Sequence, residues 1–416
     1  MLPPKLKSVF TAFDREGISW SMLRGEQNVA APGADVDLLV HPDHFGAARQ
    51  LLEDIGFVSV PAWGRGAHRF FLAYDPAGDW FELDIVTELA YGPAFMFRFP
   101  LEGECLARRQ RGQDLFVLHP DDSFWTLLLH CLLDKRDMPA RHAVRLQELA
   151  EEARVDGPLG RTVEHFCPPG WSAARLLAEV KKGEWSHFDH LYSPMMQAWI
   201  RHHPGEALSR AVTNGTLHLL EKPLLAMKRR GLSVALLGPD GAGKSTLAEG
   251  IQRSIPWPVR IVYMGLWKDS KQISGRPITQ ALEVLARPIA LWARYLPALL
   301  FKAVGGVVIF DRYAYDALLP PRPPFVWLKR VYFWILAHTC PAPDLVLVLD
   351  APGATMYGRK GESDPAQLEI ERRTFLAMHD RIRQLHVVDA TQGRDDLRRD
   401  VVGLIWRRCS ANWSSS

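Results

Sequence analysis

Apolar residues in the first 118 positions recur at two different spacings. Residues 5–17 place Leu6, Val9, Phe10 and Phe13 three or four positions apart, which predicts a helix that ends at Gly17. The runs at 68–75 and 80–89 flank the turn sequence PAGD and predict a β-hairpin. Further strands are predicted at residues 18–25 and 34–40, and a second helix at residues 45–56. This mixture predicts an α/β domain over residues 1–118.

A helical period then continues from about residue 121 to residue 230, with breaks at CPPG and HHPGE. We therefore expect a helical extension and linker over residues 119–230. The basic run KRR at 228–230 precedes GLSVALLG, a short apolar strand followed by a glycine-rich loop. A third segment, residues 231–410, begins there and has a second alternation of apolar strands and helices.

Composition narrows the class of protein without identifying a function. A chain of 416 residues is longer than a single hydrophobic core usually supports, and 47% of its residues are apolar. The formal net charge is only +3, so no specific nucleic-acid binding is expected. The five cysteines lack metal-ligand spacing and indicate reduced thiols. The N-terminus lacks the apolar core of a signal peptide, so we expect a cytoplasmic protein.

The most lipid-like stretch, residues 278–301, is interrupted by Arg287, Pro288, Arg294 and Pro297 before it reaches the length of a bilayer. It predicts a buried or amphipathic helix pair and no transmembrane segment. Its tryptophan and arginine residues are also typical of a helix in peripheral contact with a membrane surface.

The sequence LLGPDGAGKST at 236–246 carries the clearest chemistry. Its spacing, with Gly238 followed after four residues by Gly243, Lys244 and Ser245, lies between a predicted strand and a predicted helix. A polyphosphate needs backbone N–H groups at a helix N-terminus and small residues beside them. The predicted ATP-binding residues are Gly238, Asp240, Gly241, Ala242, Gly243, Lys244, Ser245 and Thr246. Lys244 would neutralise the β- and γ-phosphates, and Ser245 would bind Mg²⁺.

Two later strands end in carboxylates, at Asp311 in IFDRY and at Asp350 in LVLDAP. Ligands bind at the carboxyl ends of strands in doubly wound sheets, so Asp311 is a candidate for Mg²⁺ binding or for a catalytic base. Arg312 is a candidate for binding an acceptor phosphate, and Asp350 is equally a simple strand-end cap. Arg359 begins a basic segment that we expect to close over the triphosphate and stabilise the transition state.

Residues 232 to about 407 resemble the thymidylate kinase family through GPDGAGKST, DRY at 311–313, PDLVLVLDAP and the closing HVVDATQGRDDLRRDVVGLI. The resemblance implies a five-stranded parallel sheet, Mg-ATP phosphotransfer, Asp311 and Arg312 near the acceptor, and a lid around Arg359. Two segments depart from the family: AYDALLPPRPP replaces the serine-rich segment ending in AYQ, and the lid reads SDPAQLEIE. Kinase chemistry is therefore better supported than thymidine monophosphate as the acceptor. Where the family places acceptor contacts, this chain has Lys268, Lys271 and Arg276.

A second candidate site lies in GADVDLLVHP at 33–42. Asp35 and Asp37 point to the same side of one predicted strand, and a divalent cation would relieve their repulsion. Asp84 lies on another apolar strand that could run alongside. The three carboxylates are predicted to hold Mg²⁺.

This arrangement over residues 18 to about 90 resembles the nucleotidyltransferase superfamily, with a glycine motif, D-x-D and a third acidic strand residue. Gly25 is followed here by Glu26, where the family usually has serine or glycine, and an acidic side chain opposes a polyphosphate unless it is turned away. Arg24 could partly compensate. An active transferase site, a metal- or substrate-binding remnant and an unrelated strand all remain open.

The sequence thus predicts an α/β protein with a P-loop parallel sheet flanked by helices at the C-terminal end. The N-terminal end is expected to be a nucleotidyltransferase-like α/β domain with a helical extension. The expected activity is transfer of the ATP γ-phosphate to a nucleoside monophosphate or related small anionic molecule. A kinase for a sugar or another small metabolite, and a regulatory module without acceptor turnover, are the alternatives.

Overall fold

The computed structural model describes most of the chain. The residues that it does not describe are 1, 28, 30, 32–34, 113, 229–230, 266–276, 320–325, 362–363 and 415–416. Side chains are in addition not described at 35, 222–228, 277–285 and 414. The chain forms two compact units, Met1–Leu224 and Leu225–Ser416.

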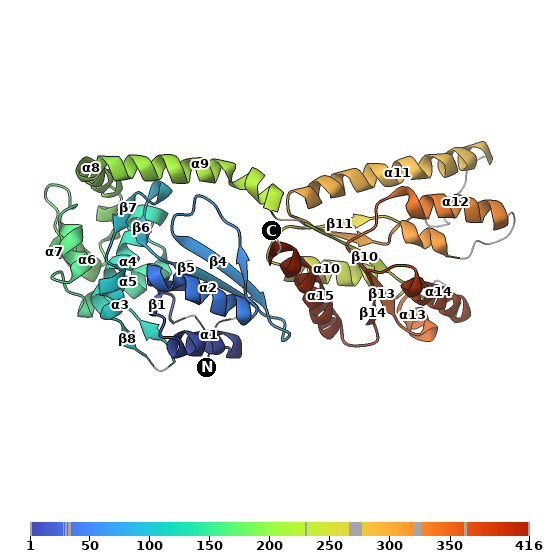
Figure 1. The fold of residues 1–416 in the computed structure, drawn as a ribbon, viewed down its shortest axis with the longest axis horizontal. Coiled ribbons are helices and arrows are strands. Elements are labelled where there is room, and N and C mark those ends of the chain that lie inside the picture. The colour runs from blue at the N-terminus through green and yellow to red at the C-terminus, as the bar shows by residue number, and fades with distance from the viewer. Residues whose placement is uncertain are drawn as a thin grey trace. The chain divides into compact units, whose positions relative to one another are not determined.

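The first unit contains a mixed seven-stranded sheet, of which Figure 1 labels β1, β4, β5 and β8. Its strand order is β3-β4-β5-β2-β1-β9-β8. Its strands are β1 (Trp20–Arg24), β2 (Asp35–Val40), β3 (Val58–Val60), β4 (His68–Tyr74), β5 (Trp80–Val86), β8 (Gln110–Arg111) and β9 (Phe116–Val117). The predicted hairpin is confirmed, because β4 and β5 pair antiparallel from His68↔Val86 to Tyr74↔Trp80. Strand β5 also runs parallel to β2, and this pairing places Asp84 opposite Asp37.

Helices α1 (Pro4–Arg15) and α2 (Phe45–Asp54) contribute to one core with the sheet, and Phe10 stacks on Trp20 at 4.6 Å between ring centroids. The other α-helices of this unit are α3 (Glu102–Ala107), α4 (Pro120–Leu129), α5 (Ala140–Glu152), α6 (Pro158–Glu164), α7 (Ala173–Lys182) and α8 (Tyr192–His202), with a π-helical turn at His130–Lys135 after α4. Helix α9 (Pro204–Lys228) begins in the first unit and runs past its last residue, Leu224. A small sheet joins β6 (Leu89–Tyr91) to β7 (Phe97–Phe99).

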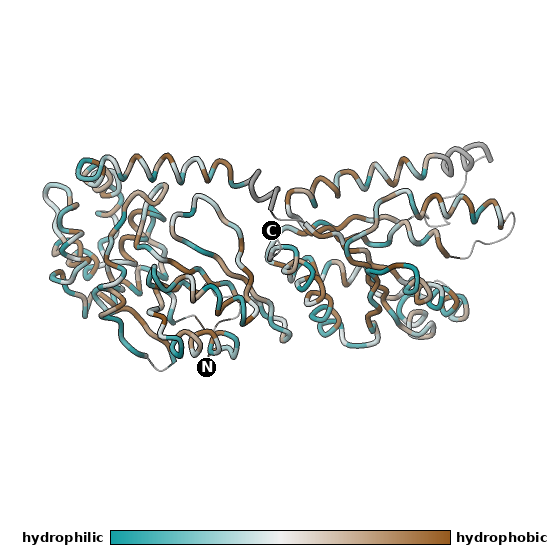
Figure 2. Tube along the Cα trace, viewed as in Figure 1, coloured by the Kyte–Doolittle hydropathy of each residue, from teal (hydrophilic) through white to brown (hydrophobic). Residues whose placement is uncertain are grey.

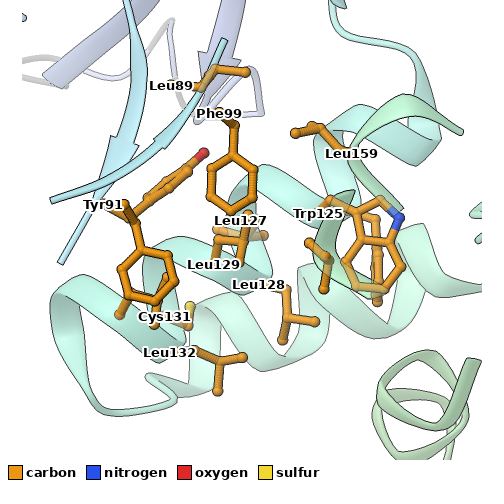
Figure 3. Close-up of a cluster of buried hydrophobic side chains, with 14 of the residues drawn as sticks. Leu89, Tyr91, Phe99, Trp125, Leu127, Leu128, Leu129, Cys131, Leu132 and Leu159 are labelled. Carbon is orange, nitrogen blue, oxygen red and sulfur yellow. The ribbon is translucent and has the colours of Figure 1, made fainter. Parts of the chain in front are cut away.

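The helices after residue 119 are more than a linker. Leu127, Leu128 and Trp125 of α4 are buried with Leu89, Tyr91 and Phe99 of the small sheet (Figure 3). The same core includes Leu39 of β2 and Val86 of β5, so the helical segment and the sheet share one hydrophobic interior. Burial of aromatic and leucine side chains between them stabilises both.

The second unit has a five-stranded sheet in which every neighbouring pair is parallel, with the order β11-β12-β10-β13-β14. Its strands are β10 (Leu232–Leu237), β11 (Val259–Tyr263), β12 (Val307–Asp311), β13 (Leu345–Asp350) and β14 (Leu385–Asp389). Its helices are α10 (Lys244–Ser254), α11 (Pro277–Ala303), α12 (Val326–Thr339), α13 (Gly353–Lys360), α14 (Pro365–Ala377) and α15 (Arg394–Ser414). This all-parallel sheet agrees with the expected P-loop fold.

Alternate residues of the central strands face opposite layers of helices. Ala235 and Leu237 of β10 are buried with side chains of α11, α12 and α14, and α10 and α15 contact β10 as well. The prediction of a helix pair at residues 278–301 is wrong, because α11 continues through Pro288 and Pro297 as one helix. Leu291, Tyr295 and Ala298 between and beyond these prolines pack into the core, which holds the helix together despite the lost backbone hydrogen bonds.

Candidate functional site

The loop between β10 and α10 has a backbone that favours glycine. Gly241 has φ +85°, and a Cβ there would collide with the carbonyl oxygen of Met356. Gly243 has φ +97° and immediately precedes Lys244, the first residue of α10. The helix N-terminus, with its unpaired N–H groups and positive dipole end, is therefore positioned to bind an anion.

Lys244 is buried, with 6% of its surface exposed. Its Nζ donates hydrogen bonds to the carbonyl oxygens of Gly238 at 2.8 Å and Pro239 at 2.9 Å. Burial lowers the pKa of Lys244 to about 8, and the nearby charge of Arg312 acts in the same direction. A lysine held inside the loop with an unfavourable charge is one that a polyphosphate would stabilise.

Ser245 and Asp311 meet at the carboxyl end of β12. The Ser245 hydroxyl donates to Asp311 Oδ2 at 2.6 Å, and Asp311 is largely buried. A hydroxyl and a carboxylate oxygen are the hard ligands that Mg²⁺ prefers. These two residues therefore fit the predicted Mg²⁺ site, which lies beside the phosphate-binding loop.

Arg312 lies directly after β12 in a left-handed conformation, with φ +66°. Non-glycine residues adopt this conformation at a cost, and such strain is frequent at functional sites. Its guanidinium contacts Asp316 Oδ2 at 3.2 Å and Asp240. Burial lowers the pKa of Arg312, but the charges of Asp316 and Asp240 outweigh this effect and raise the pKa above its usual value.

Asp316 was not among the predicted site residues. It lies in the 3₁₀ helix Ala314–Leu318 with 2% of its surface exposed, and burial raises its pKa although Arg312 and Lys244 act against this. Its second oxygen, Oδ1, is buried without a hydrogen-bond partner among the described residues. A buried carboxylate oxygen that lacks a partner is costly, which suggests that a ligand satisfies it.

The basic segment after β13 is partly bound to the protein itself. Arg359 donates to the carbonyl oxygen of Ala390 at 2.9 Å, and Lys360 Nζ lies 3.9 Å from Asp240 Oδ1. Arg372 forms a bidentate salt bridge with Asp350: Nε contacts Oδ1, and Nη2 lies 3.1 Å from Oδ2. Asp350 therefore anchors α14 to the end of β13.

The second unit has a cavity of about 1520 Å³ beside the phosphate-binding loop. Lys244, Asp311, Arg312, Arg359 and Asp316 all line it. Of the predicted ATP-binding residues, the lining also includes Asp240, Gly241, Ala242, Gly243, Ser245 and Thr246 but not Gly238. Lys268, Lys271 and Arg276, predicted on the acceptor side, lie outside the described residues.

The first unit has a smaller cavity of about 790 Å³, lined by Asp37 and Asp84 among others. Arg24 Nε lies 2.9 Å from Asp37 Oδ2, and His68 Nδ1 lies 2.7 Å from Asp84 Oδ2. Asp84 Oδ1 is buried and has no hydrogen-bond partner among the residues described. No three His, Cys, Asp or Glu side chains in the described part of the chain form a metal site, but the side chain of Asp35 is outside that part. The three-carboxylate Mg²⁺ site stays a prediction.

From the sequence, the charge of Glu26 is expected to be unfavourable for phosphate binding. In the structure Glu26 has an ion-pair partner that was not predicted from the sequence. Arg145 of α5 forms an ion pair with it, and Gln27 contacts Glu148 of the same helix at 3.2 Å. The charge of Glu26 is thereby neutralised by a residue 119 positions away. No local pattern in the sequence signals this pair.

Known proteins resemble the C-terminal part of the chain. No family model matches the sequence. The probable thymidylate kinase of Thermococcus gammatolerans is 27% identical over 214 residues, which cover 42% of this chain and 96% of the relative. The solved structure of thymidylate kinase from Candida albicans is 18% identical, with a TM-score of 0.34, and covers 44% of this chain and 93% of that protein.

The distant sequence similarity indicates a nucleotide-kinase-like domain at the C-terminal end. It leaves the N-terminal domain unidentified. Among the described residues, no helix is long and apolar enough to cross a membrane. All five cysteines are free.

Proposed function

We propose that residues 231–410 form a Mg-ATP-dependent phosphotransferase of the thymidylate-kinase-like class, working in the cytoplasm. It moves the γ-phosphate of ATP to a nucleoside monophosphate or a related small anionic acceptor. The observation that carries this proposal is that Lys244, the Ser245–Asp311 pair and Arg312 line one cavity at the ends of β10 and β12. Positioning and charge neutralisation are the main requirements of phosphoryl transfer, and this cavity offers both.

On the ATP side, the loop from Gly238 to Gly243 and the N-terminus of α10 hold the phosphates through backbone N–H groups. Lys244 exchanges its contacts with Gly238 and Pro239 for contacts with the β- and γ-phosphates. Ser245 and Asp311 would hold Mg²⁺, which when bound neutralises charge on the phosphate oxygens.

On the acceptor side, Arg312 binds the anionic group of the acceptor, and its strained backbone fixes its direction. An acceptor oxygen forms a bond with the γ-phosphorus while the bond from that phosphorus to the β,γ-bridging oxygen breaks, and ADP leaves with that electron pair. A phosphate acceptor is already deprotonated; for a hydroxyl acceptor, the alternative role of Asp311 applies, in which its carboxylate takes the proton in place of binding Mg²⁺. Arg359 stabilises the charge that develops.

Asp316 supports the alternative of a sugar or another small metabolite as acceptor. Its buried carboxylate lies beside Arg312 in the cavity, in the segment where the chain departs from the serine-rich sequence of the thymidylate kinases. A carboxylate accepts hydrogen bonds from hydroxyl or amino groups, and polyols and amino sugars contain several such groups.

The N-terminal domain is proposed to act as a second transferase or as a recognition site for the same molecule. The support is its separate cavity, where Asp84 Oδ1 is buried beside His68. The ion pair between Arg24 and Asp37 favours recognition over metal-dependent transfer, because Arg24 already neutralises Asp37.

The test is ADP release by the full chain against a panel of nucleoside monophosphates, nucleosides and sugars. We expect one class to stimulate ADP release, and Lys244→Ala to abolish the stimulation. Slow ATP hydrolysis that no acceptor accelerates would instead indicate a regulatory module. Asp37→Asn with Asp84→Asn tests the N-terminal site: if neither Mg²⁺ binding nor any transfer changes, that site is structural.

A further inference from the structure

Helices α11 and α12 are apolar on two opposite sides. On the inner side, Leu291, Tyr295 and Ala298 of α11 and Leu336 and Ala337 of α12 are buried in the core of the second unit. The outer sides of soluble helices usually carry polar residues. These two helices depart from that rule, and apolar residues recur along both (Figure 2).

The outer sides carry large exposed apolar side chains at spacings of three and four residues. Trp292 is 42% exposed, Trp327 71% and Trp334 60%. The remaining members are Ile289, Leu296, Leu299 and Leu300 of α11, Val304 directly after it, and Leu328, Val331 and Ile335 of α12. Because α11 and α12 pack against each other, these residues form one area, here called the α11–α12 surface.

The concentration of these side chains is unusual. Of the twenty-one large apolar residues that are exposed in the described chain, eleven belong to the α11–α12 surface. Scattered exposed leucines need no explanation, but a contiguous patch of this kind marks an interaction site.

The charged side chains that the structure describes on these two helices are all basic. Residues 286–304 and 326–339 contain no aspartate or glutamate. Arg294 and Arg330 are both exposed on these helices. Lys302 is bound to Asp344 at 2.6 Å, Lys329 lines the cavity, and Arg287 is half-buried beside Tyr332. We therefore assign the two exposed arginines to the surface, of which Arg294 also donates to the carbonyl oxygen of Gly265 at 3.3 Å.

We propose that the α11–α12 surface binds the face of an anionic lipid bilayer. Tryptophan prefers the boundary between headgroups and acyl chains, aliphatic side chains enter below it, and arginine contacts anionic headgroups. Since no described helix can cross a bilayer, the contact is peripheral. A second copy of the chain fits less well, because a two-fold interface would bring a cationic surface against itself.

The experiment is flotation of the full chain with vesicles of phosphatidylcholine alone or mixed with phosphatidylglycerol. We expect binding to the mixed vesicles. Trp292→Asp with Trp334→Asp should reduce it by about tenfold or more, since each change places a carboxylate in the apolar contact and repels the headgroups. The matched control is Val144→Asp with Leu208→Asp, at residues 58% and 66% exposed in the first unit, and it should bind like wild type.

A second double variant tests how much the two arginines contribute to binding of the anionic vesicles. Arg294→Gln with Arg330→Gln should weaken binding to the mixed vesicles and leave the weak binding to phosphatidylcholine unchanged. Circular dichroism and stabilisation by ATP verify that each variant is folded, and Trp327→Asp replaces the double variant if it is not. Equal binding of wild type and the tryptophan variant, or no binding to anionic vesicles, would overturn the proposal. So would a dimer in sedimentation that the tryptophan variant converts to a monomer.

Discussion

Replacing Lys244 by methionine should stabilise the protein in the absence of ATP although it destroys the nucleotide site. The pKa of Lys244 falls from 10.5 to about 8 because the charged side chain is buried. At about 1.36 kcal/mol per pKa unit, holding that charge at pH 7 costs the folded state about 3 kcal/mol. The variant also loses the two hydrogen bonds to Gly238 and Pro239, worth about 1 kcal/mol each. The net gain is about 1 kcal/mol.

The sign of this difference should reverse with pH. Below pH 8 the lysine is charged in both the folded and the unfolded protein, so the full cost is present. Between about pH 8 and 10.5 the folded protein releases the proton while the unfolded chain keeps it, and the stability of wild type relative to the variant rises. We therefore expect the variant to be more stable at pH 7 and wild type to be more stable at pH 10.

The assay is urea unfolding of both proteins at pH 7 and pH 10, followed by a probe of the second unit, without nucleotide. Lys244→Gln keeps a polar side chain and serves as control; it should show the same pH dependence relative to wild type. Addition of Mg-ATP should stabilise only wild type. A variant that is less stable than wild type by the same amount at both pH values would show that the buried charge of Lys244 carries no cost.

Three further predictions concern single contacts. Ser245→Ala should raise the Mg²⁺ concentration needed for half-maximal ADP release by about tenfold or more, measured by Mg²⁺ titration at saturating ATP, whereas an unchanged titration would remove Ser245 from the metal site. Asp316→Asn should lower kcat/KM for the acceptor by about tenfold to a hundredfold and leave KM for ATP unchanged; an equal loss for both substrates would contradict an acceptor role. Arg24→Met should destabilise the first unit by about 2–3 kcal/mol in urea unfolding because Asp37 loses its cation, and Arg24→Met with Asp37→Leu should recover most of the loss.

The second unit could be predicted well because its signals are local. The strands that end at Leu237, Asp311, Asp350 and Asp389 are short apolar runs, and a parallel sheet buried on both faces requires such runs. The phosphate-binding loop depends on glycines at fixed spacing, which a single sequence displays. The sheet, the loop and the placement of Asp311 beside Ser245 could therefore be predicted from the sequence.

The features that sequence reasoning missed depend on tertiary packing or on burial. The pairing of Glu26 with Arg145 depends on how α5 packs against the sheet, which no local spacing reports. Asp316 was noted only as a departure from a family pattern, because its burial depends on the 3₁₀ turn after Arg312. The continuation of α11 through Pro288 follows from packing onto the sheet, which overrides the local tendency of proline to end a helix.

The cavity around Lys244 is proposed to transfer phosphate to a small acceptor. The most direct measurement is the fate of γ-labelled ATP with the full chain, Mg²⁺ and the acceptor panel. Wild type and the control variant Val144→Asp should form a labelled acceptor together with ADP, and Lys244→Ala should form none. Label recovered only as inorganic phosphate, or an acceptor still labelled by Lys244→Ala, would contradict it.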